Sequence, residues 1–445
     1  MNTQIQHLDE ARSALIETLM SKWAEFHAEK LLIIEDAFGR FTLGVWGKSY
    51  SREVLQGALD SIAPFGSGSF FEAPSEAEAF DPLELATSWK EARTIDDEDL
   101  WSARIRLIVR YRMLPGWQRI TTRPLWAKEE ARPCPLVTFY SFKGGMGRTT
   151  ALSLFALSRS ILGENVVVVD CDLDAPGLGS ILAPESPPPY GVVDYLIEAP
   201  VLGKRPDDLR DYSYLVDLGK QRTAGSLRVF PSGRLDGNYL GKMARLDFET
   251  DENAEPGHRH PLEELLIQIR ENLSPDWILV DSRTGFSETA GMLLSGMCDF
   301  QVLFGVHSEQ SWDGLTYAIR KIGAERVERG IPQADSLVIH AMVPELRKEE
   351  RDALLESFAE RSRDIFSENY YSAPEADMDE AFWYLDEAGG ESSPDHPLPI
   401  SYSMSLSQSA SVPALVDILQ SSREVQRFCE VLAAHAGGEP IEARP

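Results

Sequence analysis

Cysteine is scarce in this chain of 445 residues, and its four cysteines lie far apart, at positions 134, 171, 298 and 429. No CxxC pair occurs, so the sequence predicts neither a zinc site nor a disulfide framework. Long apolar runs are missing too, since none approaches the ~20 residues that a membrane-spanning helix needs. The first thirty residues lack the basic start and apolar centre of a secretion signal. We therefore expect a cytoplasmic protein that does not enter a membrane.

Positive charge is also in short supply. Lysine and arginine number 43 against 71 aspartates and glutamates, which gives a formal net charge of -28. A surface of this charge repels nucleic acid and anionic lipid. Binding to DNA is therefore disfavoured, although such a surface leaves room for a local basic patch.

The first 125 residues show the mixed signals of a small α+β domain. A helical pattern runs through Phe26, and a strand-like segment at 30–47 has a turn at 38–40. The glycine- and serine-rich segment 65–80 predicts a loop. Residues 101–113 alternate like a strand, but acidic residues precede them and a proline closes them, and we predict a helix there.

Four arginines alternate with apolar residues inside that last segment, at Arg104, Arg106, Arg110 and Arg112. They form either a patch for an acidic partner or nucleic acid, or a solvated face paired with nearby carboxylates. The second reading is favoured, because a run of charge is usually a solvated face.

Beyond a proline-bearing stretch at 114–136, strand and helix patterns alternate, which predicts an α/β fold with a mostly parallel sheet flanked by helices. The expected strands are 136–141, 165–170, 227–231, 277–281, 300–306 and 335–341. The expected helices are 148–162, 260–273, 311–328, 347–366 and a final helix over 413–435, after a loop-like tail at 371–399.

A glycine-rich loop joins the first of these strands to the first helix, in the sequence VTFYSFKGGMGRTTAL at 137–152. Gly144, Gly145 and Gly147 allow a tight turn whose backbone N–H groups point at phosphate oxygens, and the helix dipole adds to this. Thr149 occupies the position whose hydroxyl would bind Mg²⁺, and Thr150 is placed to reach the α-phosphate. The strand, loop and helix context therefore predicts a phosphate-binding loop.

Arg148 stands where such a loop usually ends in lysine. The usual lysine is a point charge between the β- and γ-phosphates, whereas arginine offers a planar fork of donors. Positive charge beside the phosphates is kept, so we expect Met146, Arg148 and the rest of the loop to bind nucleotide with an altered geometry.

The segment KGGMGRTT resembles the deviant Walker A motif, KGGxGK followed by Ser or Thr, of the ParA/MinD/ArsA-type P-loop ATPases. The arginine form is similar to the subgroup described as KGGVGR-variant ATPases. The resemblance covers about 136–345 and implies ATP and Mg²⁺ as ligands. It also implies that Lys143 reaches across a nucleotide-bound homodimer to the phosphates of the other subunit.

Two acidic segments fall where this family places its catalytic carboxylates. In NVVVVDCDLDAPGLGS, the resemblance assigns Asp170 to the neighbourhood of Mg²⁺ and Asp172 to orienting the attacking water, with Asp174 as an extra carboxylate. In PDWILVDSRTGFSETAG, Asp281 matches the Walker B position and would hold Mg²⁺ through a water.

The residues that follow Asp281 depart from the family pattern. Gly285 is placed to give its N–H to the γ-phosphate, as a contact that is lost on hydrolysis. Arg283 has no counterpart, and it is either a second positive group in the site or the partner of an acidic neighbour. For the nucleotide base, the resemblance places His340 where the family often has an asparagine that contacts adenine. It places 397–406 as the other wall of the base pocket.

Taken together, the resemblance predicts a slowly hydrolysing, ATP-dependent and Mg²⁺-dependent switch that dimerises around nucleotide and regulates a protein partner, in a bacterial regulatory or defence role. Residues 1–125 would be the partner or output domain, 126–345 the ATPase domain, and 346–445 a helical extension packed on it. The alternatives are a nucleotide-responsive scaffold with little turnover, which Arg148 favours, and a DNA-partitioning type of ATPase.

Overall fold

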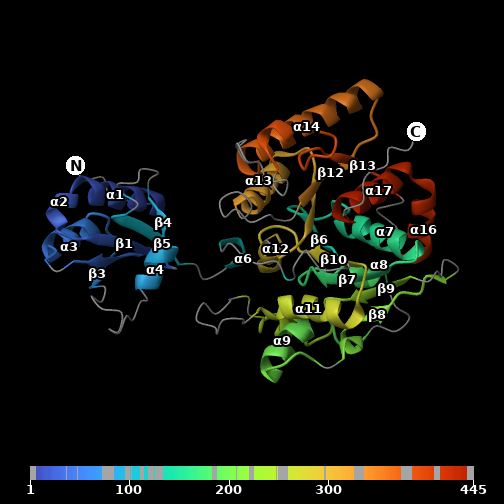
Figure 1. Cartoon of the computed structure of the whole chain (residues 1–445), viewed down its shortest axis with the longest axis horizontal. Helices are drawn as coiled ribbons and strands as arrows, with labels where there is room; N and C mark the ends of the chain where they lie inside the picture. Colours follow the sequence, from blue (N-terminus) through green and yellow to red (C-terminus); the bar gives the residue numbers. More distant parts are fainter. Residues whose placement is uncertain are drawn as a thin grey trace. The chain divides into compact units, whose positions relative to one another are not determined.

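The structure is a computed structural model of the whole chain (Figure 1). It describes residues 7–36, 38–47, 49–72, 85–95, 101, 103–110, 115–118, 125, 134–182, 188–206, 208–219, 225–246, 248, 259–294, 297–324, 335–371, 383–404 and 411–437. The chain divides into two compact units, Met1–Met113 and Leu114–Pro445. The expected three-domain division stays a prediction, and most of its first boundary region lies outside the described residues.

The smaller unit is a five-stranded sheet with helices on both faces. Its strands follow the order β3-β2-β1-β5-β4, with β1 parallel to β5 and antiparallel to β2. Side chains of α1 and α3 bury one face of the sheet, and Leu85 of α4 packs on the other. The elements are α1 (Leu8–Ser21), α2 (Trp23–Phe26), β1 (Lys30–Glu35), β2 (Phe41–Trp46), α3 (Arg52–Asp60), β3 (Gly66–Glu72), α4 (Leu85–Glu91), β4 (Arg93–Thr94) and β5 (Ile105–Val109).

Two predictions for this unit are wrong. Gly66–Glu72 is strand β3 rather than a loop, because it pairs with β2 at the edge of the sheet. Ile105–Val109 is strand β5 rather than a helix. Its alternation places Ile105 and Leu107 in the core, and this burial outweighs the helix-like charge pattern at the ends of the segment.

The arginines of this strand are bound to neighbouring groups within the unit. Arg104 lies over the ring of Trp23, and Arg106 lies over Trp89 with its guanidinium 4.9 Å from the ring centroid. Arg106 also donates to the Trp89 carbonyl, and Arg110 donates to the Ser88 hydroxyl at 2.7 Å. These contacts favour a structural role over a nucleic-acid patch. The fourth arginine, Arg112, lies outside the described residues.

The larger unit has an α/β fold with a mostly parallel sheet of eight strands flanked by helices (Figure 1). The strand order is β13-β12-β11-β6-β10-β7-β9-β8, and only β8 runs antiparallel to its neighbour. The strands are β6 (Leu136–Ser141), β7 (Asn165–Cys171), β8 (Tyr214–Leu215), β9 (Ser226–Phe230), β10 (Trp277–Ser282), β11 (Phe300–Gly305), β12 (Asp335–Val343) and β13 (Leu398–Ser401).

Helices cover both faces of this sheet because the central strands are apolar on both sides. Val137 and Phe139 of β6 face a core that includes α7, α16 and α17, and Leu136 faces one that includes α9 and α11. Helices α12, α13 and α14 enclose a third core. The longer helices are α7 (Arg148–Ile161), α9 (Val192–Leu202), α11 (Pro261–Leu273), α13 (Glu309–Gly323), α14 (Lys348–Asn369), α16 (Val412–Ser421) and α17 (Arg423–Gly437), with α6 (Pro115–Gln118), α8 (Leu178–Ile181), α10 (Tyr239–Met243) and α12 (Glu288–Leu293) shorter.

The six strands expected from the sequence are confirmed, as are four of the five helices within a few residues of their ends. The prediction of one final helix is wrong, because Ser422 takes an extended conformation that separates α16 from α17. Of the expected loop at 371–399, residues 372–382 lie outside the described residues, Leu385–Glu387 forms a short 3-10 helix, and the last two residues belong to β13 instead. Among the residues that the structure describes, no helix is long and apolar enough to cross a bilayer.

Candidate functional site

The glycine-rich loop runs from the end of β6 into α7, as expected. Gly145 and Gly147 have φ angles of 75° and 78°, which only glycine adopts without strain. A Cβ added at Gly144, Gly145 or Gly147 would meet no atom within 4 Å, so the loop backbone borders open space. Since the first N–H groups of α7 have no partner inside the helix, the loop and the helix start form a cradle for an anion.

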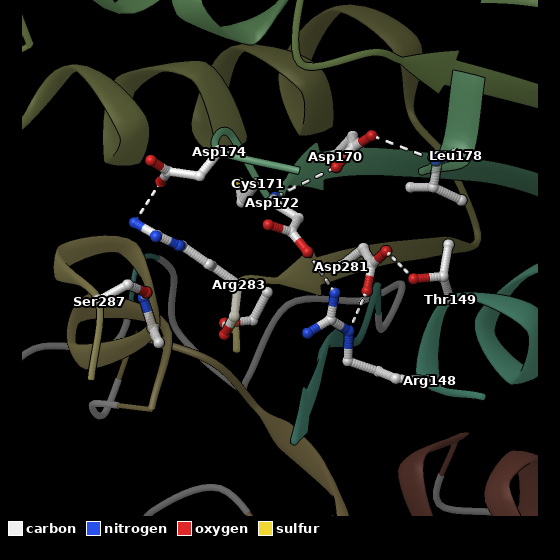
Figure 2. A network of polar contacts seen from close by, with 12 residues as sticks. Arg148, Thr149, Asp170, Cys171, Asp172, Asp174, Leu178, Asp281, Arg283 and Ser287 are labelled. Atoms are coloured by element: carbon white, nitrogen blue, oxygen red, sulfur yellow. Dashed lines mark hydrogen bonds and ion pairs between the residues drawn. The ribbon is translucent and has the colours of Figure 1, made fainter. Parts of the chain in front are cut away.

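Arg148 is buried beside this loop and bridges two carboxylates (Figure 2). Its Nε donates to Asp281 Oδ1 at 2.6 Å, and its Nη2 donates to Asp172 Oδ2 at 2.9 Å. Burial alone would lower the pKa of Arg148, but the two carboxylates outweigh it and the pKa is raised. The arginine therefore neutralises the acidic centre, and it also lines the cavity beside the glycine-rich loop.

Thr149 and Asp281, both expected to bind Mg²⁺, lie next to each other. The Thr149 hydroxyl donates to Asp281 Oδ2 at 2.7 Å. Burial raises the pKa of Asp281, and Arg148 and Thr149 counteract this. A hydroxyl and a carboxylate are the oxygen ligands that Mg²⁺ takes in phosphate-binding sites. Among the residues that the structure describes, no group of three or more His, Cys, Asp and Glu is placed to hold a metal ion.

Asp170 lies beside Asp281 in the sheet but has other partners. Its Oδ1 accepts from the backbone N of Asp172 at 3.1 Å, and its Oδ2 accepts from the N of Leu178 at 3.3 Å. Burial, together with the nearby charge of Asp281, raises the pKa of Asp170 to about 8. Both oxygens therefore brace the turn before α8, and Thr149 and Asp281 are better placed to hold a metal.

The loops after β7 and β10 are joined by an ion pair between Asp174 and Arg283 (Figure 2). Both side chains are about two-fifths exposed, so the contact lies at the rim of the acidic centre. Gly285, in the same loop as Arg283, has a φ angle of 67°. Its carbonyl accepts from the Tyr140 hydroxyl at 3.3 Å. Of the two readings of Arg283, the structure shows the pairing with an acidic neighbour.

Lys143 is half-buried in the loop, and it has no ion pair within the part of the chain that the structure describes. Met146 is buried in the core beneath α7, and Thr150 follows Thr149 at the helix start. All three loop positions thus stay candidates, but Lys143 differs from Arg148 in lacking a carboxylate partner.

A cavity of about 570 Å³ opens from this loop toward β13 and α17. Its polar end is formed by residues 144–150, Asp172 and Thr284. Its far end is apolar, with Leu154, Phe304, Val425 and Phe428, and it is closed by residues 400–403. The expected wall at 397–406 thus lines the cavity in part. Leu154 and Phe428 were missed, because an apolar residue on a helix predicts core packing with or without a ligand.

His340 does not line this cavity. Its ring stacks on Phe358 of α14, with centroids 3.9 Å apart and planes 8° from parallel. Ile339 and Ala341 face the opposite core, so the alternation of β12 turns His340 away from the loop. A bulge follows, with Met342 at a φ angle of 56°, and Ala341 and Met342 line the cavity instead. The alternation of the strand was the signal that could have found this.

No model of a known protein family matches the chain, and no curated protein matches it. Solved structures with a similar fold include the septum site-determining protein MinD from Pyrococcus horikoshii, complexed with Mg-ADP. The two sequences are 17% identical, and the superposition covers 70% of this chain and 100% of the MinD chain with a TM-score of 0.43.

Two further structures are comparable. A variant of Cyanothece McdA in complex with ATP is 14% identical and covers 71% of this chain and 100% of its own, with a TM-score of 0.45. ParA of pNOB8, bound to nonspecific DNA, is 14% identical and covers 69% of this chain and 100% of its own, with a TM-score of 0.43.

We predict that His340→Phe makes the free energy of unfolding less sensitive to acid. Burial lowers the pKa of His340 to about 4, with smaller effects from His307 and Arg351. Below about pH 6.5 the His340 side chain is protonated in the unfolded chain, whereas in the folded chain it is protonated only near its lowered pKa. The free energy of unfolding therefore decreases as the pH falls through this range. The variant keeps the stacked ring and should lose about 2 kcal/mol less than wild type in free energy of unfolding between pH 7.5 and pH 5.

Denaturant unfolding at the two pH values measures this difference. His396→Gln serves as the control, because its side chain is exposed and lies outside the core. If wild type and His340→Phe lose equal free energy of unfolding between the two pH values, the lowered pKa of His340 is not the cause of the acid sensitivity.

Proposed function

We propose that this chain binds Mg²⁺·ATP and acts as a nucleotide-dependent switch that hydrolyses ATP slowly. One observation carries the proposal: a backbone cradle at a helix start lines a cavity beside a hydroxyl and a carboxylate that already contact each other. The cradle is the loop 144–150, and the contact is that between Thr149 and Asp281. The resemblance of KGGMGRTT to the deviant Walker A motif supports the same function.

Each group has a proposed task. The loop amides and Thr150 bind the phosphates, Thr149 and Asp281 hold Mg²⁺, and Asp172 orients the attacking water. The metal supplies neutralisation of the charge that develops on the phosphate oxygens. The Gly285 N–H contacts the γ-phosphate, and the apolar end of the cavity takes the base.

Arg148 is the residue in which this site differs from the usual phosphate-binding loop. Asp172 is bound to Arg148, so its carboxylate must be released or shared before it orients a water. An anion in the cradle would attract the guanidinium, and Thr149 and Asp281 would hold a Mg²⁺ ion whose charge could take its place. We propose that this exchange accompanies nucleotide binding and slows turnover.

The switch is proposed to act as a homodimer with a protein partner. Lys143 has no carboxylate partner among the described residues, which suits a group that acts on the phosphates of another subunit. The smaller unit is the candidate output module. A regulatory or defence role in bacteria rests on the motif resemblance.

A nucleotide-responsive scaffold with little turnover is the second candidate, because Arg148 binds both Asp281 and Asp172. Tight ATP binding without phosphate release, even with the cellular partner present, would select it. A DNA-partitioning function is the third candidate. The net charge of -28 and the contacts of Arg104 and Arg106 with tryptophan rings disfavour it.

Gly147→Ala tests the nucleotide site. We expect ATP affinity to fall at least about tenfold, because the strained loop no longer presents its amides to the phosphates. Gly203→Ala is the matched control, since Gly203 also has a positive φ angle of 60° and open space around it. Both variants should lose about 1 kcal/mol of stability, and only the first should lose affinity. Calorimetric titration with Mg²⁺·ATP measures this, and a wild type that binds no ATP would end the proposal.

Arg148→Ala tests the proposed exchange between arginine and metal. Removing the arginine leaves two buried carboxylates without a counter-charge, so we expect a loss of about 3–5 kcal/mol in stability. Mg²⁺ alone should then raise the melting temperature of the variant and not that of wild type. Arg159→Ala removes the partly buried pair with Glu164 and should show no such response. Thermal melts in MgCl₂ and in NaCl of equal ionic strength measure it, and identical Mg²⁺ responses in all three proteins would contradict the exchange.

Lys143→Ala tests the proposed dimer. Light scattering should show wild type as a dimer with Mg²⁺ and a non-hydrolysable ATP analogue, and as a monomer with ADP or no nucleotide. The variant should stay monomeric throughout, because the cross-subunit charge is missing. Lys22→Ala, which changes an exposed lysine in the smaller unit, should behave as wild type. If wild type has the same size in all three conditions, the nucleotide-bound homodimer is ruled out.

A further inference from the structure

The segment that opens the larger unit is packed tightly on the loop after Asp281. Helix α6 begins at Pro115, shortly after β5 of the smaller unit ends at Val109, and it lies against α12. The two helices meet through glycines. A Cβ on Gly116 would lie 2.7 Å from the backbone N of Met292, and one on Gly291 would lie 2.5 Å from the carbonyl carbon of Gly116.

Trp117 fixes this contact with a hydrogen bond. Its indole Nε1 donates to the carbonyl oxygen of Ser287 at 2.7 Å, across 170 positions of sequence. Ser287 is the N-cap of α12, and its hydroxyl accepts from the N of Ala290. The Ser287 N–H in turn donates to the Gly285 carbonyl. The indole therefore holds the residue that sets the geometry of the turn at Gly285.

Aromatic contacts link the same tryptophan to the phosphate-binding loop. Its ring meets Phe286 edge-on, with centroids 5.0 Å apart. Phe286 meets Phe142, which lies in the loop between β6 and Gly144, at 5.1 Å. Trp117 also lies 6.1 Å from Tyr140, whose hydroxyl donates to the Gly285 carbonyl. The turn at Gly285 is thus bounded by α6 on one side and by the phosphate-binding loop on the other.

We propose that Trp117 is a positioning residue for the turn 284–287, and that through it the segment 115–118 sets how well the site distinguishes triphosphate from diphosphate. This rests on the proposed function, in which the Gly285 N–H contacts the γ-phosphate. Segment 115–118 lies at the start of the larger unit, so a displacement of α6 would reach the turn through the indole hydrogen bond.

Simple packing of an apolar segment is the rival explanation, and two features argue against it. The indole N–H meets the carbonyl of a helix cap, and a phenylalanine would fill the same space without that bond. The glycine contact, moreover, brings the two backbones closer than any side chain allows, which fixes α6 in one place.

Trp117→Phe is the central variant, studied in the full-length protein. The ring contact with Phe286 is kept and the bond to Ser287 is lost. Without nucleotide, we expect amide hydrogen exchange in 283–294 to be about fivefold faster than in wild type. The ratio of the ADP to the ATPγS dissociation constants, in Mg²⁺, should fall by about fivefold, with ADP affinity unchanged.

Trp383→Phe is the matched control, because Trp383 also donates its indole N–H, to Asp335, outside the candidate site. It should change neither the exchange of 283–294 nor the nucleotide ratio. Gly116→Ala is a second way to disturb the same contact, since its Cβ would meet the backbone of α12 while no residue of the turn is substituted. Gly57→Ala is its control, because Gly57 lies in α3 with no atom within 4 Å of an added Cβ.

The possible outcomes distinguish a failure of the proposed role of Trp117 from a failure of the proposed nucleotide binding. Unchanged exchange and an unchanged nucleotide ratio in both Trp117→Phe and Gly116→Ala would overturn the role of Trp117 while ATP binding stands. A wild type that binds neither ADP nor ATPγS would overturn the proposed function, and with it the triphosphate reading of this turn. Faster exchange with a reduced ratio in both variants, and in neither control, supports the inference.

Discussion

The arrangement of the site depends on one charge placed between two carboxylates. Asp281 is fully buried and Asp172 nearly so, at the ends of neighbouring strands. Carboxylates in that environment are costly unless a cation and hydrogen bonds accompany them. Arg148 supplies both from the first position of α7, and Thr149 adds a third donor from the next residue. The start of α7 after the glycine-rich loop, the end of β7 and the end of β10 are thereby joined through a single guanidinium.

A lysine could not replace this arrangement. Its ammonium is a compact point charge, whereas the planar guanidinium offers donors in two directions at once. The Nε and Nη2 atoms of Arg148 use two of these directions for different carboxylates, and Nη1 is buried without a hydrogen-bond partner. Arg148 is also one of the residues that line the cavity beside the loop. The arginine in the motif therefore places its positive charge between Asp172 and Asp281.

The sequence predicted the parts of the fold that depend on local patterns. Buried parallel strands such as β7 and β10 are continuous apolar runs, and a glycine loop between a strand and a helix has few other uses. The errors came where tertiary contacts decide. The segment at Ile105 paired with β1 instead of forming a helix, Ser422 broke a continuous helical pattern, and the alternation of β12 turned His340 away. The bond from Trp117 to Ser287 spans 170 positions, and no local pattern predicts such a pairing.

These contacts divide the site into an inner part and an outer part. Arg148 and Asp281 are buried, Thr149 is half-buried, and short hydrogen bonds join Asp281 to the other two. The turn 284–287 is held from the outside instead, by Asp174 through Arg283, by Tyr140 and by Trp117. Its tethers come from three separate segments, and Arg283 and Phe286 are partly exposed. Any displacement of this turn must therefore change at least one of these contacts, and the bond from Trp117 of α6 to Ser287 is one of them.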